Sequence, residues 1–325
     1  MSGLPAPPRC GVSSAGGRVA STRVGVDSAT RKPDVQVSVI VPMYNAERTL
    51  AACLDGLAAQ DHPRGEHEIL LVDNGSTDAS ASIARRHPGV TLLSEPRPGA
   101  YAARNHGLRR AQGDVIAFTD PDCVPHPSWI REIVSAFADP RLELLCGRRL
   151  PARPSAVLAS IADYENTKDG FVLDGADEDL YYGYSSNMGV RKSLFERLGP
   201  FLERPRGADT LFVRKAARER SCAAIRYLPT AVVTHLELDR LSTYYRKVFL
   251  YGRHRRRNNP ILRTRALDFA ERMAVFRTTV RAGGYSLARS ATLLGALGLG
   301  SLAWFLGSAS AVVAGADGSE AAARG

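Results

Sequence analysis

Hydrophobic and polar residues alternate in blocks along residues 35–140, and these blocks predict strands and helices in turn. Four apolar runs rich in valine, isoleucine and leucine predict buried strands: VQVSVIVPM, HEILLVD, VTLLS and DVIAFT. Between them, apolar residues recur at helical spacing, as Leu50, Cys53, Leu54 and Leu57 do. Repeated strand–helix units predict an α/β fold with a mostly parallel sheet flanked by helices.

The second half of the chain is less regular. SSNMGVR predicts a short strand, and a helix from Arg191 to Leu198 is expected to end at Gly199 and Pro200. A further helix is predicted to begin near Asp209, and the run IRYLPTAVVTH predicts a strand that leads to His235.

The C-terminal region contains a long segment without charge. Residues 290–316 carry no charged side chain, and this run exceeds the roughly 20 residues that a helix needs to cross a bilayer. We therefore expect a transmembrane helix over 287–316 and a tail over 317–325. The run is also rich in glycine, alanine and serine, so a buried pair of soluble helices is the alternative.

Residues 241–284 are basic and partly amphipathic, which predicts juxtamembrane helices. Apolar residues alternate with arginines at helical spacing, namely Ala266, Phe269, Met273, Phe276 and Val280. Such a helix lies on anionic lipid or, alternatively, packs on a domain as an ordinary surface helix. Arginine beside a span is typical of the cytoplasmic side, which predicts a single-pass C-terminal anchor at the cytoplasmic face of the cell membrane.

Composition narrows the class of protein. The net charge of +10 over 325 residues is concentrated towards the C-terminus, so a nucleic-acid partner is not expected. Five scattered cysteines without a CxxC pair favour reduced thiols over a disulfide framework or a zinc site. Residues 1–34 are rich in Gly, Pro, Ser and Ala and lack an apolar core segment, which predicts a disordered lead-in rather than a signal peptide.

Polar clusters follow three of the predicted strands, at Tyr44-Asn45, at 73–76 (DNGS) and at Asp120-Pro121-Asp122. Ligands of parallel sheets bind beyond the carboxyl ends of the strands, so the clusters predict a single site there. The Asp-Pro-Asp sequence fits a metal-binding loop, and it also fits a type I turn with Asp at its first position. No GxGxxG or GxxxxGK[ST] motif is present, so neither dinucleotide nor P-loop binding is indicated.

Five segments taken in order resemble the family 2 glycosyltransferases of GT-A fold: VSVIVPMYN, ILLVDNGSTD, GAYAARNHGLRRAQGDVIAFTDPDC, SSNMGVRKSLFERLGPF and RGADTLF. The resemblance covers about residues 35–240, which we expect to form the GT-A domain. It implies an inverting, metal-dependent, hexosyltransferase-like transfer from a nucleotide-diphosphate sugar to a hydroxyl acceptor.

The resemblance implies a metal site and a donor site. Mg²⁺ or Mn²⁺ would be held by Asp120 and Asp122, with His235 either completing the shell or serving as a structural strand-end histidine. Tyr44 would flank the base, Asp73 would bond the base or ribose, and Arg104 would reach the base edge or a phosphate. The cofactor-binding set expected from the family is Pro42, Tyr44, Asn45, Asp73, Asn74, Arg104 and Asp120. Asn74 replaces a second aspartate that is frequent in the family.

The general base implied by the family is Asp209, in the segment GADT. The family usually has Glu-Asp there, and Ala208 stands in place of the Glu. Asp209 would take the acceptor proton, although it could instead cap the helix that it opens. Ser186 and Asn187 are expected to line the acceptor side. The pair Tyr244-Tyr245 and the arginines over 253–257 fit either the phosphate of a lipid-linked acceptor or a solvated patch.

These features favour a membrane-associated inverting glycosyltransferase that acts on a glycan or lipid-linked acceptor for cell-envelope polysaccharide synthesis, with membrane lipid as a further partner. A catalytically silent GT-A domain that binds a nucleotide sugar or a partner is the alternative, because of Ala208. A sugar nucleotidyltransferase is disfavoured, since PMYNAERT is not a glycine-rich, basic loop.

Overall fold

The computed structural model describes the backbone of residues 36–204, 206–262 and 265–322, and the side chains of 36–204, 206–253 and 265–310. The lead-in predicted over 1–34 therefore lies outside the described residues, as does Cys10.

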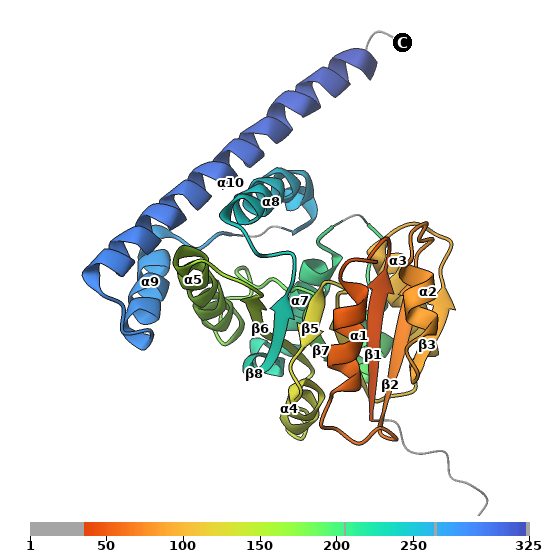
Figure 1. Cartoon of the computed structure of the whole chain (residues 1–325). Helices are drawn as coiled ribbons and strands as arrows, with labels where there is room; N and C mark the ends of the chain where they lie inside the picture. Colours follow the sequence, from red (N-terminus) through yellow and green to blue (C-terminus); the bar gives the residue numbers. More distant parts are fainter. Residues whose placement is uncertain (1–35, 205, 263–264, 323–325) are drawn as a thin grey trace, which may run out of the picture. The chain divides into compact units, whose positions relative to one another are not determined.

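The first half of the sheet is parallel, with strand order β3-β2-β1-β4. Its strands are β1 (Val37–Met43), β2 (His67–Asp73), β3 (Val90–Ser94) and β4 (Val115–Thr119). Helices α1 (Leu50–Ala58), α2 (Ser80–Arg85) and α3 (Ala100–Arg110) connect them, as Figure 1 shows. The strand–helix alternation predicted for this half is confirmed.

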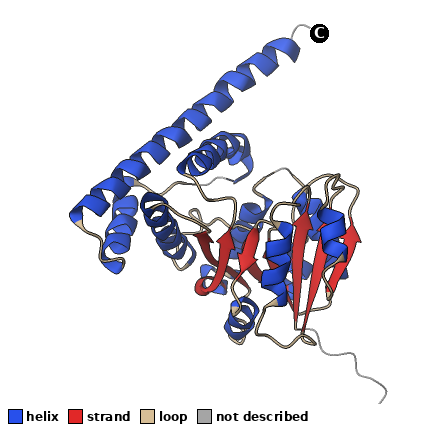
Figure 2. Ribbon diagram, in the orientation of Figure 1, coloured by secondary structure: helices blue, strands red, loops and turns tan. Residues whose placement is uncertain are grey.

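The second half of the sheet mixes directions and continues the order as β4-β7-β6-β8-β5. The pairs β4–β7, β7–β6 and β8–β5 are antiparallel, whereas β6–β8 is parallel. These strands are β5 (Cys123–Pro125), β6 (Leu144–Pro151), β7 (Asn187–Arg191) and β8 (Ile225–His235). Of the seven strand pairings in the described residues, four are parallel. The predicted α/β class, a mostly parallel sheet flanked by helices, is confirmed (Figure 2).

Three elements of this half were not predicted: β5, β6 and α5 (Ala156–Leu173). Strand β5 is only three residues long, and β6 contains two consecutive arginines that interrupt its apolar run. The hydrophobic pattern that predicts a strand is weak in both segments, and they form strands because they pair with neighbouring strands of the sheet.

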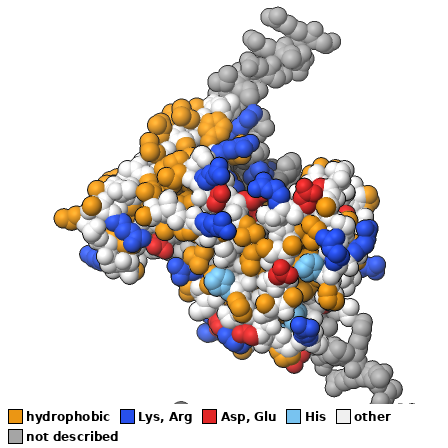
Figure 3. Space-filling view, in the orientation of Figure 1, with side chains coloured by type: hydrophobic (Ala, Val, Ile, Leu, Met, Phe, Trp, Pro, Cys, Tyr) orange, Lys and Arg blue, Asp and Glu red, His pale blue; other side chains and the backbone are white. Residues whose placement is uncertain are grey.

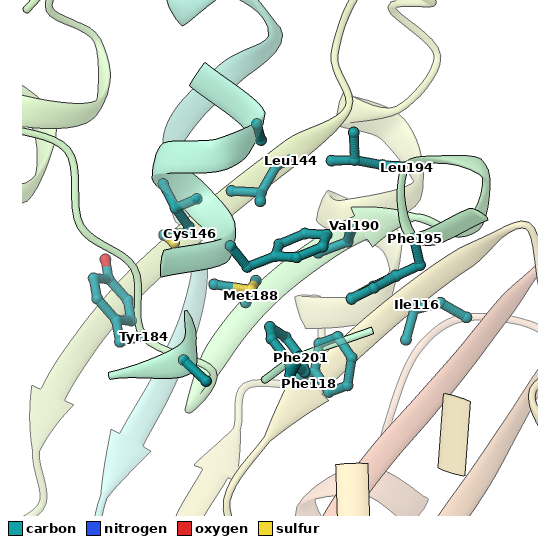
Figure 4. Packing of buried hydrophobic residues seen from close by; sticks show 14 of the residues in the cluster. Ile116, Phe118, Leu144, Cys146, Tyr184, Met188, Val190, Leu194, Phe195 and Phe201 are labelled. Atoms are coloured by element: carbon teal, nitrogen blue, oxygen red, sulfur yellow. The ribbon is translucent and has the colours of Figure 1, made fainter. Parts of the chain in front are cut away.

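Both faces of the sheet are covered by helices. Val37, Val39 and Val41 of β1 pack in a cluster with α1, α2 and α4 (Trp129–Ala136). Ile40 belongs to the opposite cluster, with residues of α3, α6 (Lys192–Leu198) and α7 (Ala208–Arg220). Figure 4 shows Phe118, Met188, Phe195 and other members of this second cluster. The period-two alternation along β1 therefore places apolar side chains in two cores.

A buried asparagine joins three parts of the second half. Asn187 is fully buried, accepts a hydrogen bond from the Trp129 indole at 2.8 Å, and donates to the carbonyls of Arg148 and Ala231 at 2.9 Å. The absence of a side chain at Gly147 makes room for Asn187, because a Cβ at position 147 would lie 2.5 Å from the Asn187 side chain. The expectation that Asn187 lines the acceptor side is wrong, because no surface of it faces outward.

Three helices follow β8, on the C-terminal side of the boundary predicted at residue 240: α8 (Leu241–Leu262), α9 (Phe269–Ala282) and α10 (Leu287–Ala322). Asp268 and Glu271 form a capping box at the start of α9. Val275 of α9 packs with Ile161 and Tyr164 of α5 and with Leu293 of α10, so one side of the predicted amphipathic helix rests on the protein. Phe269 remains 80% exposed.

The apolar C-terminal run forms one continuous helix, not a pair of helices. Leu287–Ser310 is long and apolar enough to cross a membrane, with a mean hydropathy of 1.5 in its most apolar window, and 22% of that window is buried. The helix extends beyond the predicted end of the span, to Ala322. Figure 3 shows hydrophobic side chains gathered along the coloured part of α10. Its exposed large residues are Leu287, Leu294, Leu299, Leu302, Phe305 and Leu306.

Helices α8 and α10 approach each other closely at two glycines. A Cβ on Gly252 would lie 2.2 Å from the carbonyl oxygen of Trp304, and one on Gly307 would lie 2.0 Å from that of Phe249. Small residues of this kind let two helix backbones touch, as they do between membrane helices.

Replacing Asn187 by Ala should destabilise the domain. The change leaves the buried Trp129 indole without its acceptor and two strand carbonyls without their donor, at a cost of about 3 kcal/mol in the free energy of unfolding. Urea unfolding followed by circular dichroism measures this. Thr91→Ala, on the exposed surface of β3, is the matched control and should stay within about 0.5 kcal/mol of the unmodified protein. A comparable loss in both variants would contradict this role of Asn187.

Candidate active site

The loops that follow β1 and β2 lie side by side and are hydrogen-bonded to each other. Met43 and Asp73 are partners in the strand register, and the Asn74 amide donates to the Met43 carbonyl at 2.8 Å. Asn45 has the left-handed backbone (φ 47°) that asparagine tolerates, and its side chain accepts from the Thr77 amide at 2.8 Å. The two polar clusters predicted to meet beyond these strands therefore do meet.

Tyr44 stands out from this edge. Its side chain is 62% exposed, while Pro42 behind it is buried in β1. Asp73 is only partly exposed, and one carboxylate oxygen accepts from the Ser76 amide at 3.0 Å, which ties the loop after β2 to the end of the strand. The ring of Tyr44 is thus available for stacking, and Asp73 keeps a second oxygen for a ligand.

Asn74 supports a neighbouring loop. Its amide nitrogen donates to the carbonyls of Glu95 and Arg97 at 2.8 and 2.7 Å, and its oxygen accepts from the Gly99 amide at 2.7 Å. All its hydrogen-bonding directions except one lone pair are used. A direct contact from Asn74 to the base stays a prediction, whereas its support of the 95–99 loop is observed.

The first acid of the Asp-Pro-Asp sequence has a buried partner. Arg104 of α3 is 5% exposed and donates to Asp120 Oδ1 at 2.5 Å. The guanidinium holds the Asp120 carboxylate through a charge-assisted bond, which is strong where water is excluded. The contact of Arg104 with the base edge or a phosphate stays a prediction.

The second acid lies beside His235. Strand β5 pairs with β8 so that Cys123 is the register partner of His235, which brings Asp122 Oδ2 to 3.5 Å from His235 Nε2. Burial, reinforced by Asp120, raises the pKa of Asp122 to about 6. Burial, reinforced by Lys247, lowers the pKa of His235 to about 4, so the imidazole is neutral at pH 7.

The donor atoms of this cluster fit a divalent cation. Candidate ligand atoms of Asp122, Cys123 and His235 lie within 4.8 Å of one another. Burial raises the pKa of the Cys123 thiol well above its usual range, so it stays protonated and ligates poorly. A carboxylate and a neutral imidazole remain, and they suit Mg²⁺ or Mn²⁺ with oxygen ligands added from Asp120 or a substrate.

Asp209 lies in the first turn of α7 with its carboxylate already oriented. One oxygen accepts from the Ser185 amide at 3.1 Å and its hydroxyl at 3.3 Å, and the other accepts from the Thr210 amide at 2.8 Å. Helix α7 has Gly207 at its N-cap and no side-chain cap, so Asp209 does not cap it, and Ser185 holds one carboxylate oxygen from outside the helix. The side chain of Ala208 is buried.

Helix α3 connects Asp209 with the metal-loop acid. The Asp209 amide donates to the Tyr101 hydroxyl at 3.5 Å, and one turn later Arg104 holds Asp120. The Arg104 guanidinium lies 5.2 Å from the centre of the Tyr101 ring. Two residues one turn apart on α3 therefore contact the backbone of Asp209 and the carboxylate of Asp120.

Several contributors to the site were not predicted, among them Ser185, Tyr101 and Lys247. The Lys247 ammonium of α8 lies 3.1 Å from His235 Nε2. A lysine 12 residues from the histidine, in a basic helix, gives no local signal of this contact. The residue Tyr101, in contrast, lies in the quoted family segment and could have been found from its spacing to Arg104.

The predicted phosphate-binding pair has other partners. Tyr244 donates to Glu165 of α5 at 3.2 Å, and Tyr245 donates to the carbonyl of Ala296 in α10 at 3.1 Å. Both hydroxyls thus fasten α8 to its neighbours, which contradicts a role in holding the acceptor's phosphate. Side chains over 254–257 lie outside the described residues.

Comparison with known proteins places this geometry in a family. Residues 38–199 match the sequence model described as "Glycosyl transferase family 2". Glycosyltransferase AglE of Haloferax volcanii is 31% identical over 170 residues, which cover 51% of this chain and 55% of that protein. Glycosyltransferase GlyA of Streptococcus pneumoniae is 35% identical over 167 residues, which cover 50% of this chain and 22% of that protein. The chain thus spans about half, or less, of the length of these relatives.

A solved structure extends the likeness over most of the chain. The mannosyltransferase PcManGT from Pyrobaculum calidifontis, in complex with GDP-Man and Mn²⁺, superimposes with a TM-score of 0.52 and 25% identity. The superposition covers 91% of this chain and 83% of that chain.

Replacing Glu95 by Gln should lower stability in a pH-dependent way. Hydrogen bonds from Arg97 lower the pKa of Glu95 to about 2, below the value near 4.3 of an unfolded chain. A depressed folded-state pKa adds stability that is complete above about pH 5 and is lost as the pH falls through about 2. The difference in free energy of unfolding between the two proteins should therefore be largest above pH 5.

Urea unfolding between pH 6 and pH 2.5 measures this difference. Glu196→Gln, at an exposed position of α6, is the matched control, and its effect should stay small at every pH. A difference for Glu95→Gln that grows as the pH falls would contradict the assignment.

Proposed function

Since residues 38–199 place this chain in glycosyl transferase family 2, as the motifs predicted, we propose that it transfers a sugar from a nucleotide-diphosphate sugar to a hydroxyl acceptor with inversion. The observation that supports the proposal is that α3 contacts both parts of the expected site: Tyr101 accepts from the Asp209 amide, and Arg104 bonds Asp120, next to Asp122 and His235.

The oriented carboxylate of Asp209 suits a single displacement. As the acceptor oxygen bonds the anomeric carbon, its proton passes to Asp209, and the bond from that carbon to the diphosphate oxygen breaks with its electron pair on the leaving group. One displacement inverts the anomeric carbon. Ser185 and Thr210 hold the base in place, so little reorganisation is needed when the acceptor arrives.

The donor would lie along the edge formed by β1, β2 and β4. Tyr44 offers an exposed ring for the base, and Asp73 offers a carboxylate oxygen for the base or ribose. Asp120, Asp122 and His235 would hold Mg²⁺ or Mn²⁺, whose charge opposes that of the departing diphosphate. PcManGT supports this arrangement, because it was solved with a nucleotide sugar and Mn²⁺.

We further propose that α10 anchors the enzyme to the cytoplasmic face of the membrane, where a glycan or lipid-linked acceptor of the cell envelope would meet the site. Support comes from the exposed apolar residues of Leu287–Ser310 and from the glycine contacts that join α10 to α8.

Replacing Asp209 by Asn should abolish transfer while donor binding persists. Loss of the general base lowers the rate by about 10²–10⁴-fold, because the amide accepts no proton at neutral pH. The test measures consumption of UDP- and GDP-sugars by the full chain with Mn²⁺, beside donor binding by calorimetry. Asp239→Asn, at a partly exposed position before α8, is the matched control and should keep the full rate.

Unchanged consumption by the Asp209 variant would remove this residue from the reaction. Donor binding without turnover by the unmodified chain would favour the catalytically silent alternative, and the absence of any donor binding would contradict both.

Adding charge to the exposed face of α10 should release the protein from membranes. Leu302→Lys places an ammonium on a residue that is 53% exposed, at a cost of about 3 kcal/mol if that position lies in hydrocarbon. Fractionation and flotation with vesicles measure the effect on the full chain. Leu202→Lys is the matched control, because Leu202 is 56% exposed on the GT-A domain, and it should stay with the membrane. A soluble unmodified chain would contradict the anchor.

A further inference from the structure

A cationic side chain from outside the sheet reaches the metal-ligand cluster. The ammonium of Lys247, on α8, lies 3.1 Å from His235 Nε2. His235 Nε2 also lies 3.5 Å from Asp122 Oδ2. The Lys247 charge also acts on Asp122, whose pKa it lowers against the effect of burial. The ammonium thus contacts one of the residues expected to hold the metal, His235, and its charge acts on a second, Asp122.

Contacts on either side of Lys247 hold helix α8 in place. One turn before, Tyr244 bonds Glu165 of α5 and Tyr245 bonds the backbone of α10. One turn after, Gly252 touches the backbone of α10. Because the helix is held on both sides, the four-carbon stem of Lys247 is the part that can move.

The contact between Lys247 and His235 excludes a metal bond at the same atom. An ammonium only donates, so His235 Nε2 accepts, and the lone pair that would coordinate a metal is occupied. Two cations at this distance in a partly buried site also repel each other. A metal bound to His235 and Asp122 must therefore displace the Lys247 ammonium.

A displaced ammonium needs a new anionic partner within reach of its stem. Asp120 is paired with Arg104, and Asp209 is held by Ser185 and Thr210. Glu237, whose charge acts on His235, is exposed to solvent. The anion that arrives with the metal is the diphosphate of the donor, which gains further charge when its bond to the sugar breaks. An ammonium placed beside that oxygen stabilises the leaving group.

We propose that Lys247 exchanges partners during the reaction: it pairs with His235 when the site holds no metal, and with the leaving diphosphate when metal and donor are bound. The inference rests on the proposed function, and it makes α8 part of the donor site. It assigns Lys247 two effects of opposite sign, since the ammonium competes with the metal alone but assists the metal–diphosphate complex.

The test compares Lys247→Met and Lys247→Arg with the unmodified full chain. The matched control is Arg246→Met, which removes a neighbouring exposed cation from the same helix. Free Mn²⁺ is followed by electron paramagnetic resonance, and UDP, GDP, UMP and GMP are titrated by calorimetry in the presence of Mn²⁺. Thermal unfolding reports whether each variant is folded.

Lys247→Met should bind Mn²⁺ alone several-fold more tightly, because the competing cation is gone. It should bind UDP or GDP with Mn²⁺ roughly tenfold more weakly, as expected for one lost charge-assisted hydrogen bond. Affinity for UMP or GMP should change less than about threefold, since the contact is to the terminal phosphate. Lys247→Arg should retain the diphosphate affinity, and Arg246→Met should leave all affinities unchanged.

Unchanged Mn²⁺ affinity or unchanged diphosphate affinity in a folded Lys247→Met protein would overturn the exchange. A parallel loss of Mn²⁺, diphosphate and monophosphate binding would overturn it as well, because a merely structural lysine gives that result. If the unmodified chain binds no nucleoside diphosphate, the proposed function fails together with the inference. Normal binding by the unmodified chain with an unresponsive Lys247→Met variant contradicts the inference alone.

Discussion

Three carboxylates gathered at one edge of a sheet, in partial burial, are the constraint on which the rest of the structure depends. Each needs a partner, because an unpaired charge held away from water is costly. Asp120 takes the buried guanidinium of Arg104, Asp209 takes the Ser185 amide and hydroxyl, and Asp122 lies beside His235 and Lys247. The partners come from α3, from the chain before β7 and from α8, so the acids determine how these segments must converge.

The mixed half of the sheet makes this convergence possible. The reversal at β7 and the parallel pairing of β6 with β8 return the chain to β5, where His235 pairs with Cys123. Asn187 and Gly147 secure this region at the point where the register of β6 and β8 shifts. A hydrogen-bonded residue in the core therefore supports a ligand set at the surface.

The C-terminal helices connect the site with the apolar helix. Helix α8 contacts α10 through glycines and reaches His235 through Lys247, while α9 and α5 complete a separate apolar cluster. If α10 lies in a membrane, the acceptor side of the site is held near lipid by direct contacts rather than by a flexible linker.

The sequence by itself determined the parallel half of the sheet, because strand and helix periods are local properties, and it determined that Tyr44, Asp73 and Asp120 lie at one edge, because parallel strands share an edge. It also predicted Asp209 as the general base, from spaced motifs that resemble the family. Only the tertiary structure decided that Arg104 holds Asp120, that Asn187 is buried, that Tyr244 and Tyr245 fasten a helix, and that Lys247 reaches His235. These depend on pairings between distant segments, such as β8 with β5 and α8 with α10, and no local pattern encodes which distant partner a polar side chain will meet.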